Sequence, residues 1–410
     1  MIKIKGIFVS MSFLQIYKKA FSGLPSKVWV LSLAMVVNRS GSMVLLFTSL
    51  YLTKELHYTL AEAGFVMSLY GIGSILGSYI GGWLTDRRNF YDIMIASLIV
   101  CACVLMLMVF VTSLYGIAAI IFTYAFTADI FRPANSAAIA FYSEASNRTR
   151  SVSLVRIATN LGFTIGPAVG GFVAHYLGYK WLFVIDASTS VFAALMLVLY
   201  LPRRKVGHEH HEKKTIATKS AYQDYWYLAF IFLVAVYATC FFQIFASVPQ
   251  FLSRSWLYDE DKIGLLLALN GLLVVLIEMP LVMHLENKNN KFKYIIWGAL
   301  CLPVSFFILL IANQNLLMAI AYTFIITMSE IYAMPFMMNI ALSRPDKSRQ
   351  GQYAALYSIA YGLANIAAPL LGLGIAARYG FTTMFWVLIV VSTFLALGFY
   401  QLINKYKQLN

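Results

Sequence analysis

The feature that most constrains the fold of this chain is a succession of apolar runs, each long enough to cross a lipid bilayer. A spanning helix needs about 20 mostly apolar residues. Twelve such runs occur, near 28–52, 59–84, 92–112, 114–141, 152–176, 181–201, 226–252, 262–284, 293–312, 315–341, 352–377 and 381–403. They are continuous and do not alternate over about ten residues as barrel strands do. The sequence therefore predicts an all-α membrane protein with twelve transmembrane helices.

The composition is that of a chain whose main partner is the lipid bilayer. Of its 410 residues, 60% are hydrophobic and 12% are charged, whereas soluble domains carry about a quarter charged residues. The net charge of +14 does not indicate nucleic-acid binding, because the basic residues are spread over short loops. The four cysteines lie in apolar runs and indicate neither disulfides nor a metal site. His208, His210 and His211 lie in a polar stretch and are interpreted as solvated residues rather than metal ligands.

The distribution of Lys and Arg orients the predicted helices. With the N-terminus in the cytoplasm, 23 of the 31 Lys and Arg residues lie in cytoplasmic segments, five in outer loops and three inside the runs. Because cytoplasmic loops carry the excess of basic residues, we expect both termini to be cytoplasmic. The prediction is a multi-pass monomer of the cell inner (plasma) membrane.

The longest polar connection, residues 202–225, divides the runs into two sets of six. We interpret it as a cytoplasmic linker. It separates an N-terminal six-helix bundle within 1–201 from a C-terminal six-helix bundle within 226–410. Before the first run, residues 13–21 are expected to form an amphipathic helix on the membrane surface.

The two halves repeat each other. Shifts of 200 and 202 residues carry glycines and prolines of the first half onto matching residues of the second. The matched pairs include Pro133 with Pro335, Pro167 with Pro369, Gly170 with Gly372, Gly64 with Gly264 and Gly71 with Gly271. A parallel repeat of this kind forms pseudo-symmetric bundles with a binding site between them at the bilayer midplane, and access alternates as the bundles rock.

A first motif lies between the second and third runs, which are joined by Gly82-Trp-Leu-Thr-Asp86-Arg87-Arg88. This segment resembles the loop signature of the major facilitator superfamily, which has a glycine, an aspartate and an arginine at this spacing. We expect Gly82 to let helices approach closely. We expect Asp86 to stabilise a neighbouring helix N-terminus and to pair with a basic residue. The family pattern continues with a glycine and two basic residues, whereas residues 89–91 are Asn-Phe-Tyr.

A second motif lies in the fifth run, Gly162-Phe-Thr-Ile-Gly166-Pro167-Ala-Val-Gly170-Gly171. It is similar to the antiporter signature of the same superfamily, with every glycine and the proline in place. Gly162 and Gly166 form a small-residue face, and Pro167 is expected to bend the helix. The motif favours an exporter, although simple tight packing would serve an importer as well.

The resemblance covers nearly the whole chain, and the class it resembles most is the twelve-helix drug:proton antiporters. It implies the major facilitator fold and proton-coupled transport of a small molecule, without a cofactor. The leading hypothesis is export of an amphiphilic or drug-like compound by alternating access. The alternatives are proton-coupled uptake of a zwitterionic or anionic solute such as a short peptide, and a non-transporting membrane sensor or scaffold. An enzyme is not expected, because no phosphate-binding loop, nucleophile elbow or metal cluster is evident.

Seven charged residues lie inside apolar runs, where a charge persists only if it faces a cavity or a partner. They are Arg39, Arg132, Arg156, Asp129, Asp186, Glu278 and Glu330. The first half holds all three arginines and the two aspartates, and the second half holds the two glutamates. A cavity between the halves would therefore be positive on one wall and negative on the other, which suits a zwitterion or an anion exchanged against protons.

Three of these carboxylates, Asp129, Glu330 and Glu278, are the candidates for proton coupling, because an unpaired buried carboxyl group can carry a proton near neutral pH. Asp129 and Arg132 share one helix face. Their pair is interpreted either as a proton or substrate site or as a static ion pair that bridges helices. Glu278 could equally be a structural acid on the cytoplasmic side.

The other site candidates rest partly on the superfamily resemblance, which implies that helices one, four, seven and ten line the cavity. Candidates for the substrate cavity are Arg39, Asn38, Arg132, Asn135, Gln243, Tyr357, Tyr361 and Asn365. Candidates for gating and conformational change are Gly82, Asp86, Arg87, Arg156, Gly162, Gly166, Pro167, Gly170 and Gly171. The tyrosine stripe could instead be helix packing, and Arg156 could simply reach the cytoplasmic surface. Asp186 is expected to cap or gate the outer end of the sixth helix.

Overall fold

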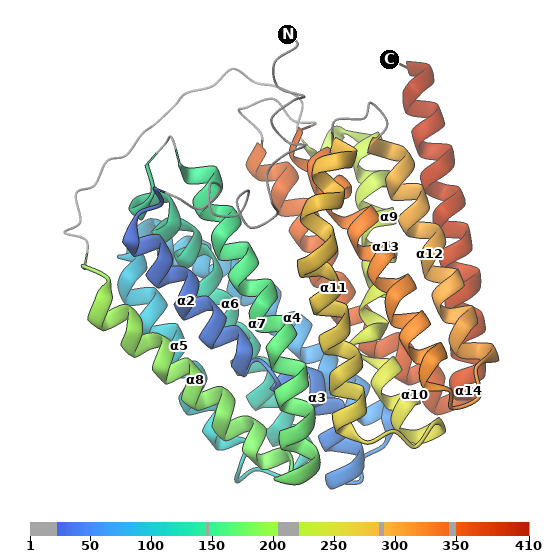
Figure 1. The fold of residues 1–410 in the computed structure, drawn as a ribbon, viewed down its shortest axis with the longest axis horizontal. Helices are drawn as coiled ribbons and strands as arrows, with labels where there is room; N and C mark the ends of the chain where they lie inside the picture. Colours follow the sequence, from blue (N-terminus) through green and yellow to red (C-terminus); the bar gives the residue numbers. More distant parts are fainter. Residues whose placement is uncertain (1–22, 145–146, 204–220, 287–290, 344–349, 410) are drawn as a thin grey trace, which may run out of the picture.

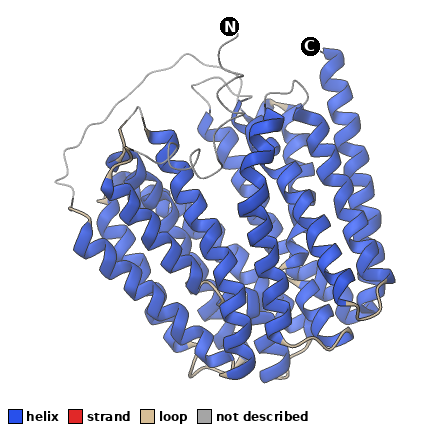
Figure 2. Ribbon diagram, in the orientation of Figure 1, coloured by secondary structure: helices blue, strands red, loops and turns tan. Residues whose placement is uncertain are grey.

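The computed structural model describes residues 23–144, 147–203, 221–286, 291–343 and 350–409, and in these residues every regular element is helical (Figure 2). The helices are α2 (Ser26–Gly41), α3 (Val44–Leu50), η1 (Tyr51–Glu55), α4 (Leu60–Arg87), α5 (Phe90–Leu107), α6 (Leu114–Tyr142), α7 (Arg148–Tyr176), α8 (Tyr179–Tyr200), η2 (Ala221–Gln223), α9 (Tyr225–Phe241), η3 (Phe242–Ile244), α10 (Ser247–Ser255), α11 (Glu260–Glu286), α12 (Lys291–Ile311), α13 (Leu316–Ser343) and α14 (Gln350–Leu409). The predicted surface helix at 13–21 and the three linker histidines lie outside the described residues.

Ten helical stretches of the described chain are long and apolar enough to cross a membrane. One of them, Ala355–Asn404, covers the last two predicted runs except for residues 352–354. Within it Gly380 has φ 82° and ψ 164°, so the helical path is interrupted between those runs. A further predicted run, 262–284, lies in α11 but is not among the ten. The predicted all-helical membrane fold is confirmed, while the count of twelve spans stays a prediction.

The first and seventh predicted runs each correspond to one membrane-length stretch, Ser26–Glu55 and Tyr225–Ser255, but each stretch contains a break in its helix. The first run is divided between α2 and α3 at residues 42–43, and the seventh between α9 and α10 at residues 242–246. The two breaks therefore lie at matching places in the two halves. At the first break a Cβ atom on Gly41 would lie 3.2 Å from the Cα atom of Asp186, so α8 approaches too closely for a side chain there.

The helices form two groups, with α2 to α8 in one and α9 to α14 in the other (Figure 1). Helix α4 packs against α14, and α7 packs against α11, so both contacts join the groups. The groups separate toward the end of the molecule at which α2 begins and α14 stops, here named the termini end (Figure 1). They meet at the opposite end, here named the closed end, where Gln250 Nε2 of α10 donates to Thr53 Oγ1 of η1 at 2.8 Å.

Close packing inside the first group depends on glycines at four-residue intervals on α4. A Cβ atom on Gly73, Gly77 or Gly81 would collide with the backbone of α6, and at Gly81 it would lie 2.7 Å from the Cα atom of Ile130. A Cβ atom on Gly82 would meet no atom within 4 Å. The prediction that Gly82 permits close approach is therefore wrong, because the adjacent Gly81 occupies the packed face of the helix.

Many large apolar side chains point away from the helical core. Phe110, Leu199 and Phe394 are 78%, 72% and 68% exposed, respectively. In water such a surface would be strongly unfavourable. It is the surface expected of helices whose outer faces contact lipid chains.

Candidate functional site

Asp129 and Arg132 lie on the same face of α6, in the first group of helices. Arg132 Nε is 3.1 Å from Asp129 Oδ1, and the Ser74 hydroxyl of α4 donates to Asp129 Oδ2. The Asp129 side chain is buried, whereas 66% of the Arg132 side chain is exposed. The carboxylate thus joins α6 to α4 within one group, and the guanidinium group keeps donors available to a further partner.

Glu330 of α13 has a different environment. Its Oε2 accepts a hydrogen bond of 3.1 Å from the side-chain amide of Asn270 on α11, and Asn270 also donates to Thr327 Oγ1 at 2.9 Å. In the described residues no Lys, Arg or His lies within ion-pair distance of Glu330. It is therefore the one proton-coupling candidate whose carboxyl group has a neutral partner and no basic one in the described structure.

Arg156 and Glu278 form an ion pair that joins the two groups of helices. Arg156 Nη2 of α7 lies 3.2 Å from Glu278 Oε1 of α11. The Arg156 side chain is 50% exposed and the Glu278 side chain is 14% exposed. One positive charge of the first half and one negative charge of the second half are therefore paired across the interface.

Arg39 and Asn38 of α2 line a cavity of about 20 Å³ inside the first group of helices, together with Ser97, Tyr124 and Ser190. The Asn38 amide donates to Ser190 Oγ at 3.3 Å, so it points toward α8 rather than the space between the groups. The guanidinium carbon of Arg39 lies 5.5 Å from the centre of the Phe163 ring. The Arg39 Nε atom is buried without a hydrogen-bond partner.

Asp186 lies beside the break in the first helical run, close to this cavity. Its side chain is 1% exposed, and the Tyr124 hydroxyl donates to its Oδ2 at 3.4 Å. The carboxylate is therefore held in the interior of the first group, near the end of α2. Asp186 lies inside α8, whose N-cap is Gly178, so it does not cap that helix, whereas its gating role stays a prediction.

Gln243 differs from its predicted place on the cavity wall. It is 1% exposed, its amide nitrogen donates to the Ala368 carbonyl oxygen at 3.0 Å, and its Oε1 accepts from Ser247 at 2.5 Å. These bonds satisfy polar groups at the break between α9 and α10 and tie the break to α14. The residue is part of the packing of the second group.

The tyrosine stripe on α14 forms a pair of hydrogen-bonded rings. The Tyr357 hydroxyl donates to the Tyr361 hydroxyl at 3.2 Å, and the Tyr361 ring packs edge-on against Phe242. Asn365 is half-buried one turn further along the stripe. On α6, Asn135 is buried and its Oδ1 atom has no hydrogen-bond partner.

The glycines of the 162–171 segment pack α7 against two different neighbours. Cβ atoms on Gly162 and Gly166 would lie 3.0 Å and 3.3 Å from backbone atoms of Arg39, and one on Gly170 would lie 3.0 Å from Met43 Cβ. Gly171 faces α11 instead, where a Cβ atom would lie 3.1 Å from the Cα atom of Gly264. The motif thus contacts the broken first helix on one side and the other group on the opposite side.

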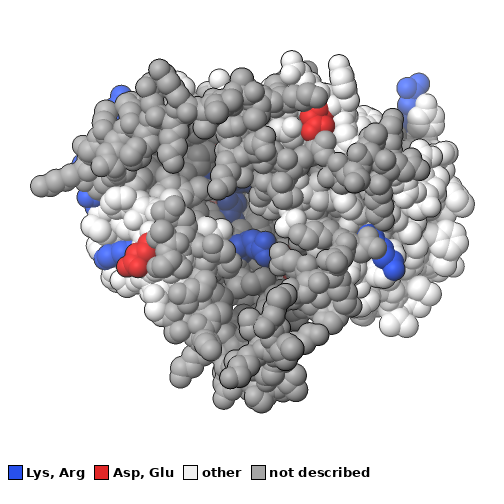
Figure 3. Space-filling model, turned by 90° about the horizontal axis from the view of Figure 1, so that it is seen from above, with Lys and Arg blue, Asp and Glu red and all other residues white. Residues whose placement is uncertain are grey.

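The loop motif after α4 is described only in part. The structure gives the backbone of Asp86 but not its side chain, so its predicted pairing stays a prediction. The Arg87 guanidinium carbon lies 4.1 Å from the centre of the Trp83 ring. Figure 3 views the termini end and shows Lys and Arg side chains near the centre of that face, where the surface is hollowed.

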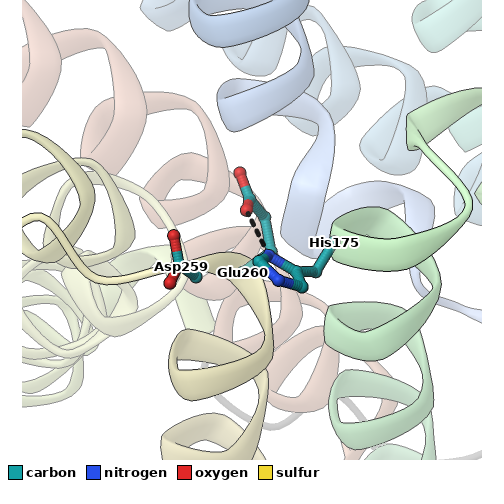
Figure 4. Close-up of side chains that lie close together, drawn as sticks. All are labelled: His175, Asp259 and Glu260. Atoms are coloured by element: carbon teal, nitrogen blue, oxygen red, sulfur yellow. Dashed lines mark ion pairs between the residues drawn. The ribbon is translucent and has the colours of Figure 1, made fainter.

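A polar cluster at the closed end escaped the sequence analysis. Glu260, the first residue of α11, lies before the apolar stretch of that helix and is 6% exposed. Its Oε1 is 2.8 Å from Lys54 Nζ and accepts from the Tyr179 hydroxyl. Its Oε2 is 3.9 Å from His175 Nδ1 (Figure 4). Burial raises the pKa of Glu260, but the hydrogen bonds from Lys54 and Tyr179 outweigh burial and hold it below the ordinary value.

This cluster was missed because its members stand at helix ends, where a charged residue usually means a solvated loop. Lys54 follows the first run and Glu260 precedes the eighth, and no sequence spacing relates them. Asn270 left a weaker but usable signal, because it is a lone amide inside an apolar run. A buried amide in such a run needs a polar partner, and Glu330 is that partner.

Comparisons with known proteins agree on one family. A sequence profile described as Major Facilitator Superfamily matches residues 31–369. The chain is 23% identical over 405 residues to a Na(+), Li(+), K(+)/H(+) antiporter of Planococcus maritimus, covering 90% of this chain and 94% of that protein. It is 22% identical over 338 residues to multidrug resistance protein 2 of Bacillus subtilis (strain 168), covering 78% and 81% of the two chains.

The solved structures agree on the fold. A POT family transporter in complex with 5-aminolevulinic acid matches the chain with a TM-score of 0.79 at 15% identity. The match covers 92% of this chain and 96% of that one.

Proposed function

Because the chain belongs to the major facilitator superfamily, we propose that it exports small amphiphilic or drug-like organic molecules by alternating access, in exchange for protons. Members of this family are multi-pass membrane transporters rather than enzymes. The finer statement, export driven by protons, rests on the arrangement of the buried charges and on the α7 motif.

The observation that carries proton coupling is the environment of Glu330. Asp129 and Glu278 each have an arginine within 3.2 Å, so losing either negative charge would break an ion pair. Glu330 is hydrogen-bonded by the neutral Asn270 amide. An amide can bond to the carboxyl group in both its charged and its neutral form. A proton can therefore arrive at and leave Glu330 without breaking an ion pair.

Export is favoured by the 162–171 segment of α7. Its glycines contact the broken first helix and α11, so a movement of α7 would displace residues packed against it in both groups of helices. The relative from Bacillus subtilis named multidrug resistance protein 2 is consistent with this direction. We assign the closed end to the outer face and the termini end to the cytoplasm of the inner membrane, with twelve spans in two bundles around a linker at 202–225.

Reconstitution into liposomes with an imposed pH gradient tests this proposal. Lipophilic cations and other amphiphilic compounds should accumulate on the acidic side, since protons would flow the opposite way. The control is wild-type protein in liposomes without a pH gradient, where only equilibration of the compound is expected. Absence of any gradient-dependent movement, across compounds that bind the protein, would refute proton-coupled export.

One observation favours a second function, proton-coupled uptake of a zwitterionic or anionic solute such as a short peptide. The Arg132 guanidinium is largely exposed in the first group, while Glu330 lies in the second. Charges of opposite sign on two walls suit the carboxylate and the amine of one zwitterion. Movement of such a solute in the same direction as protons would replace export by uptake.

A further inference from the structure

We propose that the closed end carries a binding site for a divalent transition-metal ion such as Zn²⁺, formed by His175, Asp259 and Glu260. The site lies outside the buried charges assigned to transport. His175 belongs to the last turn of α7, in the first group of helices. Asp259 and Glu260 lie at the start of α11, in the second group. A metal bound there would connect the two halves of the molecule.

The positions of the ligand atoms fit a single ion. One ligand atom from each of the three side chains lies within 4.8 Å of the other two (Figure 4). His175 Nδ1 and Glu260 Oε2 are 3.9 Å apart, which is too long for a hydrogen bond. Two ligands that each bind one zinc ion at about 2.0–2.2 Å can be at most about 4.2 Å apart. Small side-chain rotations would bring all three groups to that range.

The carboxylate of Glu260 is already oriented for this role. Lys54 and Tyr179 both approach Oε1, and no side chain of the described residues donates to Oε2. Because Glu260 is 6% exposed, its rotation is restricted, and Oε2 stays directed toward His175. Hydrogen bonds to the non-ligating oxygen of a carboxylate are the usual support of a metal ligand.

The chemistry of the donors selects the kind of ion. One imidazole nitrogen with two carboxylate oxygens is a ligand set that zinc and related transition metals accept, whereas Mg²⁺ and Ca²⁺ prefer oxygen ligands only. Lys54 opposes binding, because it adds a positive charge 2.8 Å from Glu260 Oε1. The two carboxylates and the ammonium group together leave one net negative charge to meet the dication.

The site is complete only while the two groups meet at the closed end. A metal ion that needs ligands from both groups binds this conformation and stabilises it by mass action. If the protein works by alternating access, which is the proposed function, such an ion would slow the opening of the closed end and inhibit transport. Binding itself does not depend on that function.

The direct test is thermal unfolding of the purified full chain in ZnCl₂, with MgCl₂ as the control salt. The measurement uses a background in which His208, His210 and His211 are replaced by Ala, since those linker histidines could bind zinc independently. Zn²⁺ should raise Tm and Mg²⁺ should not. His175→Ala should weaken the apparent zinc affinity by about 10-fold or more, the scale set by loss of a metal-site contact. His57→Ala, another histidine near the closed end, should leave it unchanged.

Lys54→Ala gives an independent check in which binding should improve. Removing the ammonium group removes the repulsion of the dication, so zinc should bind more tightly although the protein without metal is less stable. Three results would overturn the proposal. They are equal zinc-induced Tm shifts in His175→Ala and His57→Ala, no zinc-induced Tm shift in the triple-Ala background, and weaker zinc binding in Lys54→Ala. If zinc binding depends on His175 but no substrate is transported, the site stands and the proposed function falls.

Discussion

Gly171→Ala is the substitution for which the structure gives the most direct expectation. A Cβ atom at this position would lie 2.5 Å from the carbonyl oxygen of Glu260 and 3.1 Å from the Cα atoms of Asp261 and Gly264. All three are backbone atoms of α11 and its first turn, so none can rotate aside as the end of a side chain could. The two groups of helices must therefore separate slightly at the closed end to accommodate one methyl group.

The size of the effect follows from the cost of overpacking. Adding a methyl group to a well-packed contact costs about 1–3 kcal/mol, which changes a two-state ratio by about 5- to 150-fold. The cost applies only to the conformation in which the closed end is closed, because the contact is absent when the groups move apart. Gly171→Ala should accordingly shift the population toward molecules whose closed end is open.

Pulsed electron paramagnetic resonance can measure this shift through a distance across the closed end. Spin labels at Lys180 and Arg254, both exposed, report from the first and second groups, after Cys101, Cys103, Cys240 and Cys301 are replaced. The longer-distance population should grow in Gly171→Ala. Gly82→Ala is the matched control, since a Cβ atom there meets nothing within 4 Å. Identical distance distributions in the two variants would refute the reasoning.

Four further expectations concern the charged groups. Glu330→Gln should abolish pH-driven transport but spare exchange of labelled for unlabelled substrate; persistent pH-driven accumulation would remove Glu330 from the mechanism. Lys54→Ala should cost about 1 kcal/mol of stability in thermal melts, the scale of a partly exposed ion pair. The pKa of Glu260 is lowered in the folded state. Ionised Glu260 therefore adds to the free energy of unfolding above its unfolded pKa of about 4.3, and this stabilisation is lost as the pH falls through the folded-state pKa. Glu260→Gln should flatten that acid dependence, and an unchanged dependence would assign it elsewhere. Arg156→Ala and Glu278→Ala should show a coupling of about 0.5–1 kcal/mol in a double-mutant cycle, and strict additivity would show that the pair contributes nothing.

The sequence was sufficient to predict the features that depend on the length of the apolar runs and on the positions of small residues. Each predicted run falls mainly on helical residues, and the two halves have breaks at corresponding places, residues 42–43 and 242–246. The breaks themselves were not predicted, because each lies inside a run that is apolar enough overall to cross a membrane. The contacts at the breaks are tertiary, namely the close approach of α8 at Gly41 and the hydrogen bond from Gln243 to the Ala368 carbonyl oxygen.

The buried charges were found from the sequence, but their partners were not. Spacing on one helix paired Asp129 with Arg132, and the structure places these groups 3.1 Å apart. No spacing could pair Arg156 with Glu278 or Glu330 with Asn270, because those contacts join separate helices. The wrong prediction for Gly82 has the same cause. Gly81 and Gly82 point to different faces of α4, and the sequence does not show which face packs against α6.

The central claim is that a proton moves against the substrate through Glu330. Proteoliposomes that enclose a pH-sensitive dye test it directly, when a compound known to bind is presented at high concentration on one side and no pH gradient is imposed. The account predicts a pH change that reports protons moving opposite to the compound, absent in Glu330→Gln although the compound still equilibrates. Transport of the compound by the wild-type protein without any pH change, or an equal pH change in Glu330→Gln, would contradict it.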